Sequence, residues 1–140
     1  MITKTSLQSV QAMLELAKLP NHRYEGACSI AKRIKAPQNY LGKLLQTLAN
    51  HRLVHSRKGL GGGFCLAKKP KHINLFDIVD PIENISRKVG CFLGKTRCSE
   101  KDPCPAHNRW KAAQESYMNF LMETTLEDLR EQQNLEKNEK

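Results

Sequence analysis

Apolar residues in the first fifty positions recur every three or four residues, which is the spacing of one face of an α-helix. The spacing predicts helices from Thr3 to Leu19, from Ser29 to Lys35, and from Gln38 to Asn50, the last one after Pro37, which suits a first helical turn. The residues expected to face inward are Leu7, Val10, Met13, Leu14 and Ala17, then Ile30, Ala31 and Ile34, then Leu41, Leu44, Leu45 and Leu48. Two short helices joined by a tight turn indicate a helix-turn-helix.

The next residues have the pattern of a β-hairpin. Leu53 to Lys58 and Phe64 to Ala67 can each form a strand, and four of the five residues between Lys58 and Phe64 are glycine. Glycine costs about 1 kcal/mol relative to alanine inside a helix, whereas it readily adopts the positive φ angles of a hairpin tip. A phosphate-binding loop is the alternative, but it needs a helix with Lys-Ser or Lys-Thr directly after the glycines. A hairpin in this place is typical of the wing of a winged helix.

The second half of the chain predicts three more helices. Asn74 can cap a helix from Leu75 to about Ile82, a long helix follows from Ala106 to Met122, and capping-box spacing at Thr124-Thr125 starts a short final one. The long helix has apolar positions that alternate between steps of four and three, the seam of a helix packed along another helix. These positions are Trp110, Ala113, Tyr117, Phe120 and Thr124. At roughly 25 Å the helix exceeds what so small a domain needs, so dimerisation is favoured over packing within the chain.

Positive charge is concentrated in one segment. The chain carries 23 Lys and Arg and 14 Asp and Glu, a net charge of +9, and the segment from Gly26 to Phe76 holds ten basic residues and no acidic one. A solvated face normally mixes both signs, because like charges repel each other. Unrelieved positive charge suits a polyphosphate, since each neutralised phosphate releases counterions. Together with the helix-turn-helix and the wing, this charge predicts binding to double-stranded DNA.

The candidate DNA contacts lie on the third helix, opposite its leucine stripe, and on the hairpin. Asparagine and glutamine side chains suit adenine and lysine suits guanine, while basic hairpin residues suit phosphates or the minor groove. The full candidate set is Gln38, Asn39, Tyr40, Lys43, Gln46, Arg57, Lys58 and Gly61.

A cysteine-rich loop carries the remaining chemistry. Cys91, Cys98, Cys104 and His107 fall within 17 residues. No apolar run is long enough to span a membrane and no secretory signal is visible, so we expect a cytoplasmic protein with reduced thiols. The loop lacks the Cys-x-x-Cys spacing typical of structural zinc, and wider gaps with a histidine favour an iron–sulfur cluster. Zinc and a metal-free thiol switch remain alternatives. Cys28 and Cys65 are expected to be small core residues.

From about Ile2 to Leu129 the chain resembles the Rrf2 family of bacterial winged-helix iron–sulfur regulators. The matching stretches are Ala12-Met-Leu-Glu-Leu-Ala17, Tyr40-Leu41, Leu53-Val54, Gly59-Leu-Gly-Gly-Gly-Phe64, the three-cysteine loop and Cys104-Pro-Ala-His107-Asn-Arg-Trp110. The final His-x-x-Trp resembles the IscR-like branch more than the NsrR-like one. That likeness implies a 2Fe–2S cluster, favoured over 4Fe–4S, with Cys91, Cys98, Cys104 and His107 as its ligands.

The resemblance also has departures. The NsrR-like branch can add a first-helix carboxylate to a 4Fe–4S cluster, but Leu7 stands at that position here and cannot ligate. One more residue separates Cys91 from Cys98 than in the IscR-like branch. Gly42 stands where that branch has a glutamate that tunes base preference, so the operator sequence is not transferable.

We therefore expect a mainly α-helical fold with a small β-hairpin wing: a winged helix-turn-helix followed by a long C-terminal dimerisation helix. The expected parts are a DNA-binding domain (1–82), a cluster-binding loop (83–105), a dimerisation helix with a short final helix (106–131) and a polar tail (132–140). The expected function is that of a homodimeric transcriptional regulator, such as a repressor, whose affinity for a pseudo-palindromic operator depends on its cluster. An electron-transfer protein would explain a cluster but not the acid-free segment or the wing, and no nucleophile–base pair indicates an enzyme.

Overall fold

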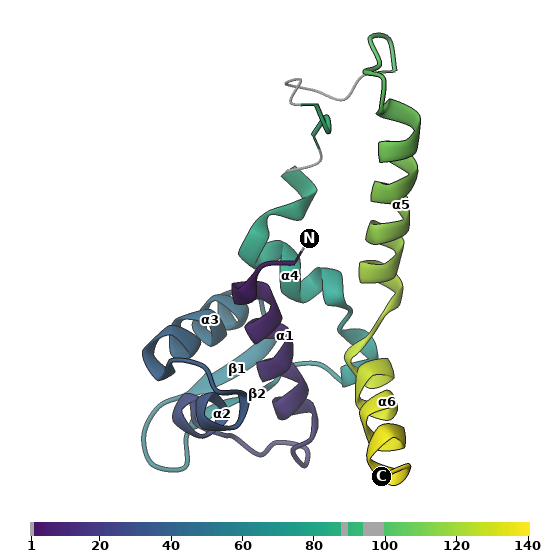
Figure 1. Cartoon of the computed structure of the whole chain (residues 1–140). Coiled ribbons are helices and arrows are strands. Elements are labelled where there is room, and N and C mark those ends of the chain that lie inside the picture. The colour runs from purple at the N-terminus through teal and green to yellow at the C-terminus, as the bar shows by residue number, and fades with distance from the viewer. Residues whose placement is uncertain (1, 88–89, 94–99) are drawn as a thin grey trace.

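The computed structural model describes residues 2–87, 90–93 and 100–140. In this part of the chain the elements follow in the order α1 (Lys4–Ala17), α2 (Ala27–Ile34), α3 (Gln38–Asn50), β1 (Val54–Arg57), β2 (Gly63–Leu66), η1 (Pro70–His72), α4 (Leu75–Glu83), η2 (Ile85–Arg87), α5 (His107–Glu123) and α6 (Leu126–Asn138). Helices α1 to α3 and the hairpin form one body, and the N-terminal half of α5 projects away from it (Figure 1). The predicted mainly α-helical fold with a β-hairpin wing is confirmed.

Local sequence signals start the helices. The Thr3 hydroxyl caps α1 by accepting a hydrogen bond from the backbone N–H of Ser6. Asn74 with Asp77 and Thr125 with Asp128 form capping boxes at the starts of α4 and α6, in which each side chain accepts from the other residue's backbone N–H. These side chains satisfy N–H groups that a helix start otherwise leaves without partners.

The starts of α4 and α6 are also joined directly to each other. The Leu75 N–H donates to the Thr124 carbonyl at 2.9 Å, and the Leu126 N–H donates to the Ile73 carbonyl at 2.9 Å. These two hydrogen bonds fix the junction between α5 and α6 against the winged-helix body, and Leu126 is fully buried there.

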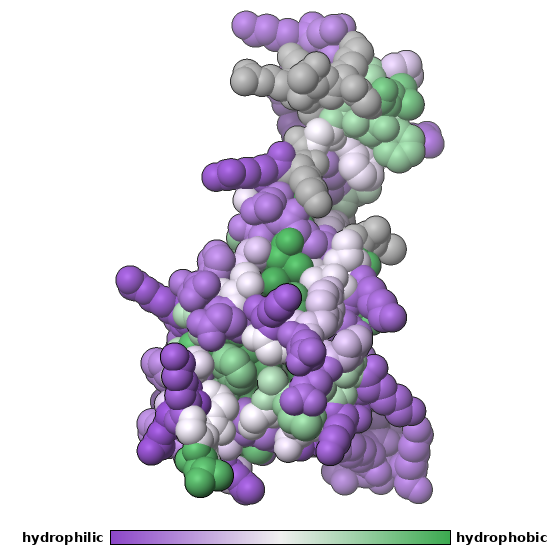
Figure 2. Space-filling model, turned by 90° about the vertical axis from the view of Figure 1, so that its left-hand side faces the viewer, coloured by the Kyte–Doolittle hydropathy of each residue, from purple (hydrophilic) through white to green (hydrophobic). Residues whose placement is uncertain are grey.

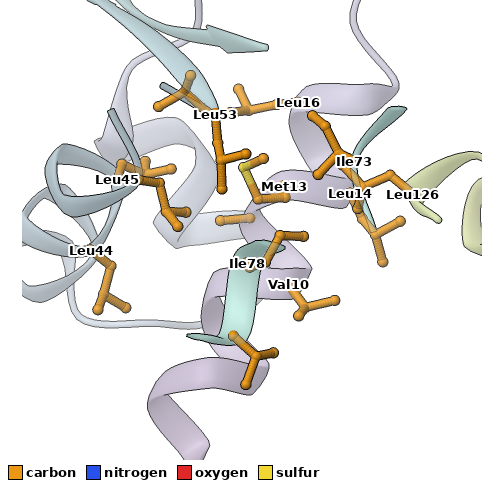
Figure 3. Close-up of a cluster of buried hydrophobic side chains, with 14 of the residues drawn as sticks. Val10, Met13, Leu14, Leu16, Leu44, Leu45, Leu53, Ile73, Ile78 and Leu126 are labelled. Atoms are coloured by element: carbon orange, nitrogen blue, oxygen red, sulfur yellow. The ribbon is translucent and has the colours of Figure 1, made fainter. Parts of the chain in front are cut away.

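One hydrophobic core lies between α1, α3, α4 and the start of α6 (Figure 3). The predicted leucine stripe of α3 is buried, and so are Met13 in α1 and Ile78 in α4. Leu7 was expected to face inward, but its side chain is 46% exposed, and that expectation is wrong. The side chains of Ser6 and Ser9 are buried in its place. The contacts between α1 and α4 orient the start of α1 so that its small residues face α4.

The hairpin has the predicted form. Strands β1 and β2 are antiparallel, with Val54 opposite Leu66 and Arg57 opposite Gly63. Gly59 and Gly61 have φ angles of 90° and 74°, the left-handed conformation that glycine adopts without a Cβ penalty. A short third segment joins the sheet beyond β2, where Glu25 pairs with Phe64.

The C-terminal helix is longer than predicted. Helix α6 continues to Asn138, through most of the segment 132–140 that was expected to be a polar tail. Residues 126–138 contain neither glycine nor proline and are rich in the good helix formers Glu, Gln, Lys and Leu. The Arg130 guanidinium also donates a 3.0 Å hydrogen bond to the Ala17 carbonyl at the end of α1. No described helix is both long and apolar enough to cross a membrane.

Candidate nucleic-acid interface and cysteine centre

The solvent-facing side of α3 carries all five of its predicted DNA-contacting side chains. They are exposed, whereas the leucines of the same helix are buried beneath them, and they are Gln38, Asn39, Tyr40, Lys43 and Gln46. The Tyr40 hydroxyl contacts the Thr5 hydroxyl of α1. Seen from the α3 side of Figure 1, the surface is mainly hydrophilic, with long polar side chains that project into solvent (Figure 2). The geometry therefore offers a polar helix face to a partner.

The wing lies at the end of the same body. Arg57, Lys58 and Gly61 are exposed, as predicted for DNA contacts. Leu60, between the two glycines of positive φ, is fully exposed at the hairpin tip, and the sequence analysis assigned it no role. The sequence signal that could have identified Leu60 is an apolar residue at a glycine-rich hairpin tip, because apolar side chains in such a position can enter the minor groove.

The basic residues of the acid-free segment are not equivalent. Arg33 lies in α2 and pairs with Glu15 of α1, with Nε 2.8 Å from Oε2, and with Glu25. Both acids precede the acid-free segment in the sequence, and their ion pairs raise the pKa of Arg33, the hydrogen bond to Glu25 most strongly. By contrast, Lys43, Arg57 and Lys58 make no ion pair within the described residues. The three basic residues of the predicted interface thus keep their positive charge available to a partner, whereas Arg33 does not.

Two of the predicted metal ligands lie together at the start of α5. Cys104 and His107 are both buried and line one cavity of about 320 Å³. The His107 N–H donates to the Cys104 carbonyl at 3.0 Å, so the turn before α5 fixes the two residues relative to each other. Pro103 and Pro105 flank the cysteine and restrict its backbone. At the cavity edge, Lys111 donates a hydrogen bond to Glu100 at 2.6 Å and thereby lowers the pKa of that carboxyl.

Cys91 is half-buried and is held through its neighbours. The Trp110 Nε1 donates a hydrogen bond to the Gly90 carbonyl at 2.8 Å, and the Phe92 ring packs on the Trp110 ring with centroids 5.2 Å apart. Trp110 follows His107 by three residues on α5. The Trp110 side chain therefore contacts both neighbours of Cys91 and connects them to α5.

The fit to a metal cluster is partial within the described residues. Cys98 lies outside them, and among them no group of three or more Cys, His, Asp or Glu side chains is close enough to hold a metal ion. A buried thiol and a buried imidazole at one cavity nevertheless form the kind of soft donor pair that iron–sulfur and zinc sites use. Cys28, half-buried, and Cys65, buried, lie in the winged-helix body, and both are free thiols, as is Cys104.

The predicted dimerisation positions divide into two groups. Tyr117 packs against the core of its own chain, and Thr124 accepts the backbone hydrogen bond from Leu75. Ala113 and Phe120 are exposed, and Met122 adds a further exposed apolar side chain near Phe120 in sequence. Trp110 has the contacts with Gly90 and Phe92. The exposed members are available to a second chain.

Comparison with known proteins connects these features. A family described as Rrf2, iron-dependent transcriptional regulator, matches residues 2–132. The regulator NsrR of Shouchella clausii is 29% identical over 129 residues, which is 91% of this chain and 87% of that protein. The structure of CymR, the global cysteine regulator of B. subtilis, superposes with a TM-score of 0.78 at 27% identity, covering 94% of this chain and 96% of that one. IscR of T. potens superposes with a TM-score of 0.75 at 26% identity, covering 94% and 87%.

The family match agrees with two features of the structure, the wing and the exposed polar face of α3. Members of this family are transcriptional regulators and not enzymes, as the sequence analysis expected. The chain therefore belongs to the Rrf2 family of winged-helix, DNA-binding transcriptional regulators.

Proposed function

We propose that this protein is a homodimeric regulator whose operator affinity depends on the state of an iron–sulfur centre in the cysteine loop. The observation that carries the proposal is the position of Cys104 and His107, which are both buried and line one cavity where α5 begins. The other end of the same helix is packed into the winged-helix body through Leu121, which is 1% exposed. One rigid element thus connects the sulfur donors with the DNA-binding part.

The proposed centre is held by Cys91, Cys98, Cys104 and His107. By the likeness to the IscR-like branch, the centre would be a 2Fe–2S rather than a 4Fe–4S cluster, and such a group would supply a site that oxygen, nitric oxide or iron depletion can alter. Gly90 and Phe92 hold the backbone at Cys91, and Trp110 keeps that segment beside α5. These contacts would order the segment at Cys91 before any metal binds, which lowers the ordering cost of binding.

At the other end, α3 enters the major groove and the wing follows the backbone. Lys43 suits guanine, while the amides of Gln38, Asn39 and Gln46 suit adenine. Arg57 and Lys58 neutralise phosphates. In a homodimer the exposed α5 residues Ala113 and Phe120 meet a second chain, and the two winged helices then match the two halves of a pseudo-palindromic operator.

The coupling between the cysteine loop and DNA binding follows from the position of α5. A change in the cysteine loop tilts α5 as a whole about its C-terminal end, where Leu121 is buried in the core and the Thr124 carbonyl accepts from the Leu75 N–H at the start of α4. The relative orientation of the two winged helices then changes, and DNA affinity reports that change as a two-state shift.

A paired gel shift tests this proposal. Protein purified without oxygen is compared with the same protein after iron chelation, on one operator fragment obtained by in vitro selection. We expect at least a tenfold difference in affinity between the two forms. Cys98→Ala should lose both cluster absorbance and the difference, whereas Cys28→Ala, the matched control in the winged-helix body, should keep both. Equal affinity of the two forms would contradict cluster sensing, and a brown Cys98→Ala protein would contradict the ligand set.

A metal-free thiol switch is the second candidate. The likeness to CymR, described as the global cysteine regulator of B. subtilis, and the buried free thiol of Cys104 support it. Iron, sulfide and zinc analysis of anaerobically purified protein separates the candidates. Iron with sulfide supports the cluster, zinc alone supports a structural metal, and neither, together with peroxide-sensitive DNA binding, supports the thiol switch.

A further inference from the structure

The guanidinium of Arg57 lies over an aromatic ring from another part of the chain. Arg57 is the last residue of β1, and its Cζ is 5.7 Å from the centroid of the Tyr24 ring, which lies two residues before the N-cap of α2. This distance is within the range of a cation–π contact. Tyr24 is half-buried while Arg57 is exposed, so a fixed ring supports a solvent-facing cation.

The ring itself is held by the sheet. The neighbouring residue Glu25 pairs with Phe64 through two backbone hydrogen bonds, of 2.9 and 2.8 Å. The backbones are so close that a Cβ on Gly63 would lie 2.2 Å from the Glu25 carbonyl oxygen. Gly63 is also the residue opposite Arg57 in the hairpin. The segment that carries Tyr24 is therefore attached to the wing next to Gly63, the residue opposite Arg57.

Two side-chain contacts add to this attachment. The Cys65 side chain of β2 lies close to the Tyr24 hydroxyl and raises the pKa of the tyrosine. The Glu25 carboxylate pairs with Arg33 of α2. The ring thus has a contact at its hydroxyl, and the backbone next to it is tied to α2.

A guanidinium is planar, and this geometry decides what the ring can do. Stacking covers one face of the group and leaves its N–H donors free at the edge, where phosphate oxygens bind. An arginine held in this way loses less side-chain entropy on binding than one that is free in solvent. The contact with Tyr24 is thus compatible with a phosphate contact by the same Arg57 side chain.

We propose that Tyr24 is a positioning residue for the wing: its ring holds Arg57 in the conformation that contacts DNA, without touching DNA itself. The inference rests on the proposed contact between Arg57 and DNA. It assigns a role in DNA affinity to a residue outside both the recognition helix and the wing. It also explains why the segment before α2 pairs with β2.

The test uses the full-length protein with two substitutions at one position. Tyr24→Phe keeps the ring and removes the hydroxyl, whereas Tyr24→Leu removes the ring and keeps a smaller apolar side chain. We expect DNA affinity of Tyr24→Phe within about twofold of the wild type, and that of Tyr24→Leu about two- to fivefold weaker, the effect of an exposed cation–π contact. Base preference at the half-site should not change, because Tyr24 does not reach the bases.

A double-mutant cycle separates positioning from a general structural effect. In an Arg57→Ala background, Tyr24→Leu should cause no further loss of affinity, since the group it positions is absent. The same loss in both backgrounds would overturn the proposal. A Tyr24→Phe variant as weak as Tyr24→Leu would also overturn it, because the hydroxyl and not the ring would then be responsible.

A measurement without DNA distinguishes this inference from the proposed function. In the NMR spectrum of the free protein, the Arg57 Nε–H resonance should show a ring-current shift that Tyr24→Phe retains and Tyr24→Leu loses. Absence of that shift in the wild type overturns the positioning role. If the shift is present but Arg57→Ala leaves DNA affinity unchanged, it is the contact between the wing and DNA that fails, and the positioning role in DNA binding fails with it.

Discussion

Trp110 and Gly90 are joined by a 2.8 Å hydrogen bond from the indole Nε1 to the backbone carbonyl, across 20 residues of sequence. Gly90 precedes Cys91, and Trp110 lies one turn after His107. The bond therefore connects two parts of the candidate metal centre through a residue that is not itself a ligand. The sequence analysis assigned Trp110 to a dimer seam, so this contact adds a second role that spacing along the helix does not reveal.

The first prediction concerns this link. Trp110→Leu removes both the hydrogen bond and the ring contact with Phe92, whereas Trp110→Phe removes the hydrogen bond alone. We expect iron release to a chelator to be several times faster in Trp110→Leu than in the wild type, with Trp110→Phe between them, because the segment at Cys91 is no longer held beside α5.

The control is Ala112→Ser, an exposed position on the same helix, which should release iron at the wild-type rate. Sedimentation velocity of each variant checks that the oligomeric state has not changed. A wild-type release rate in Trp110→Leu would contradict a role for the link.

The second prediction compares two glycines. Gly63 has a φ of 127°, and a Cβ there would meet the Glu25 carbonyl oxygen at 2.2 Å. Gly63→Ala should therefore lower the free energy of unfolding by more than about 1 kcal/mol. A Cβ on Gly42 in α3 would meet only the Ala27 Cβ, at 3.9 Å. Gly42→Ala should instead raise the free energy of unfolding by about 0.5–1 kcal/mol. Urea denaturation measures both, and a more stable Gly63→Ala protein is the result that excludes the close approach.

The third prediction concerns pH. Burial of Glu15 acts to raise its pKa, but hydrogen bonds from Lys18 and Arg33 outweigh it and bring the pKa below its ordinary value of 4.5. The stability that Glu15 contributes is therefore present above pH 4.5 and is lost as the pH falls through the lowered pKa. In urea denaturation at a series of pH values, the stability difference between the wild type and Glu15→Gln should shrink below pH 4.5.

The matched control for Glu15 is Glu136→Gln, an exposed position on α6. Its stability should follow that of the wild type across the same pH range. A constant difference between the wild type and Glu15→Gln from pH 7 to 3 would argue against stabilisation by the ionised carboxylate.

The fourth prediction concerns the two capping boxes. Asn74→Ala and Thr125→Ala each remove a side-chain acceptor for a helix-start N–H, at 2.8 Å and 3.2 Å respectively. Each should lower the free energy of unfolding by about 1 kcal/mol. Because the two caps lie across the backbone bridge between positions 74 and 125, the double variant should deviate from additivity. Asn134→Ala, exposed on α6, should change stability by less than about 0.5 kcal/mol.

Much of the fold was predictable because its signals are local. The helix over Gln38 to Asn50 begins and ends where its leucine spacing and Pro37 predict. The glycines predict the hairpin tip, since their conformational freedom does not depend on the rest of the chain. Two expectations failed, one through packing and one through local propensity. Leu7 is exposed because α4 contacts another face of α1, and residues 132–138 are helical because they continue a run of good helix formers.

The candidate site was predictable only in its chemistry. Four donors in a short loop indicate a metal or thiol centre, and the structure brings two of them, Cys104 and His107, to one cavity. The charge pattern likewise indicates DNA, but it does not distinguish Arg33, which is neutralised by Glu15 and Glu25, from Lys43, which is free of ion pairs among the described residues.

The sequence by itself determined most of the helices, the wing, the exposed polar side of α3 and the residue types of the loop, because periodicity, glycine and proline act over a few neighbouring residues. Only the tertiary structure decided which side chains meet. The pairs Arg33 with Glu15 and Trp110 with Gly90 are 18 and 20 residues apart, and Tyr24 lies under Arg57 of a later strand. Such contacts depend on how whole elements pack, and packing is settled by the shared core and not by any single segment.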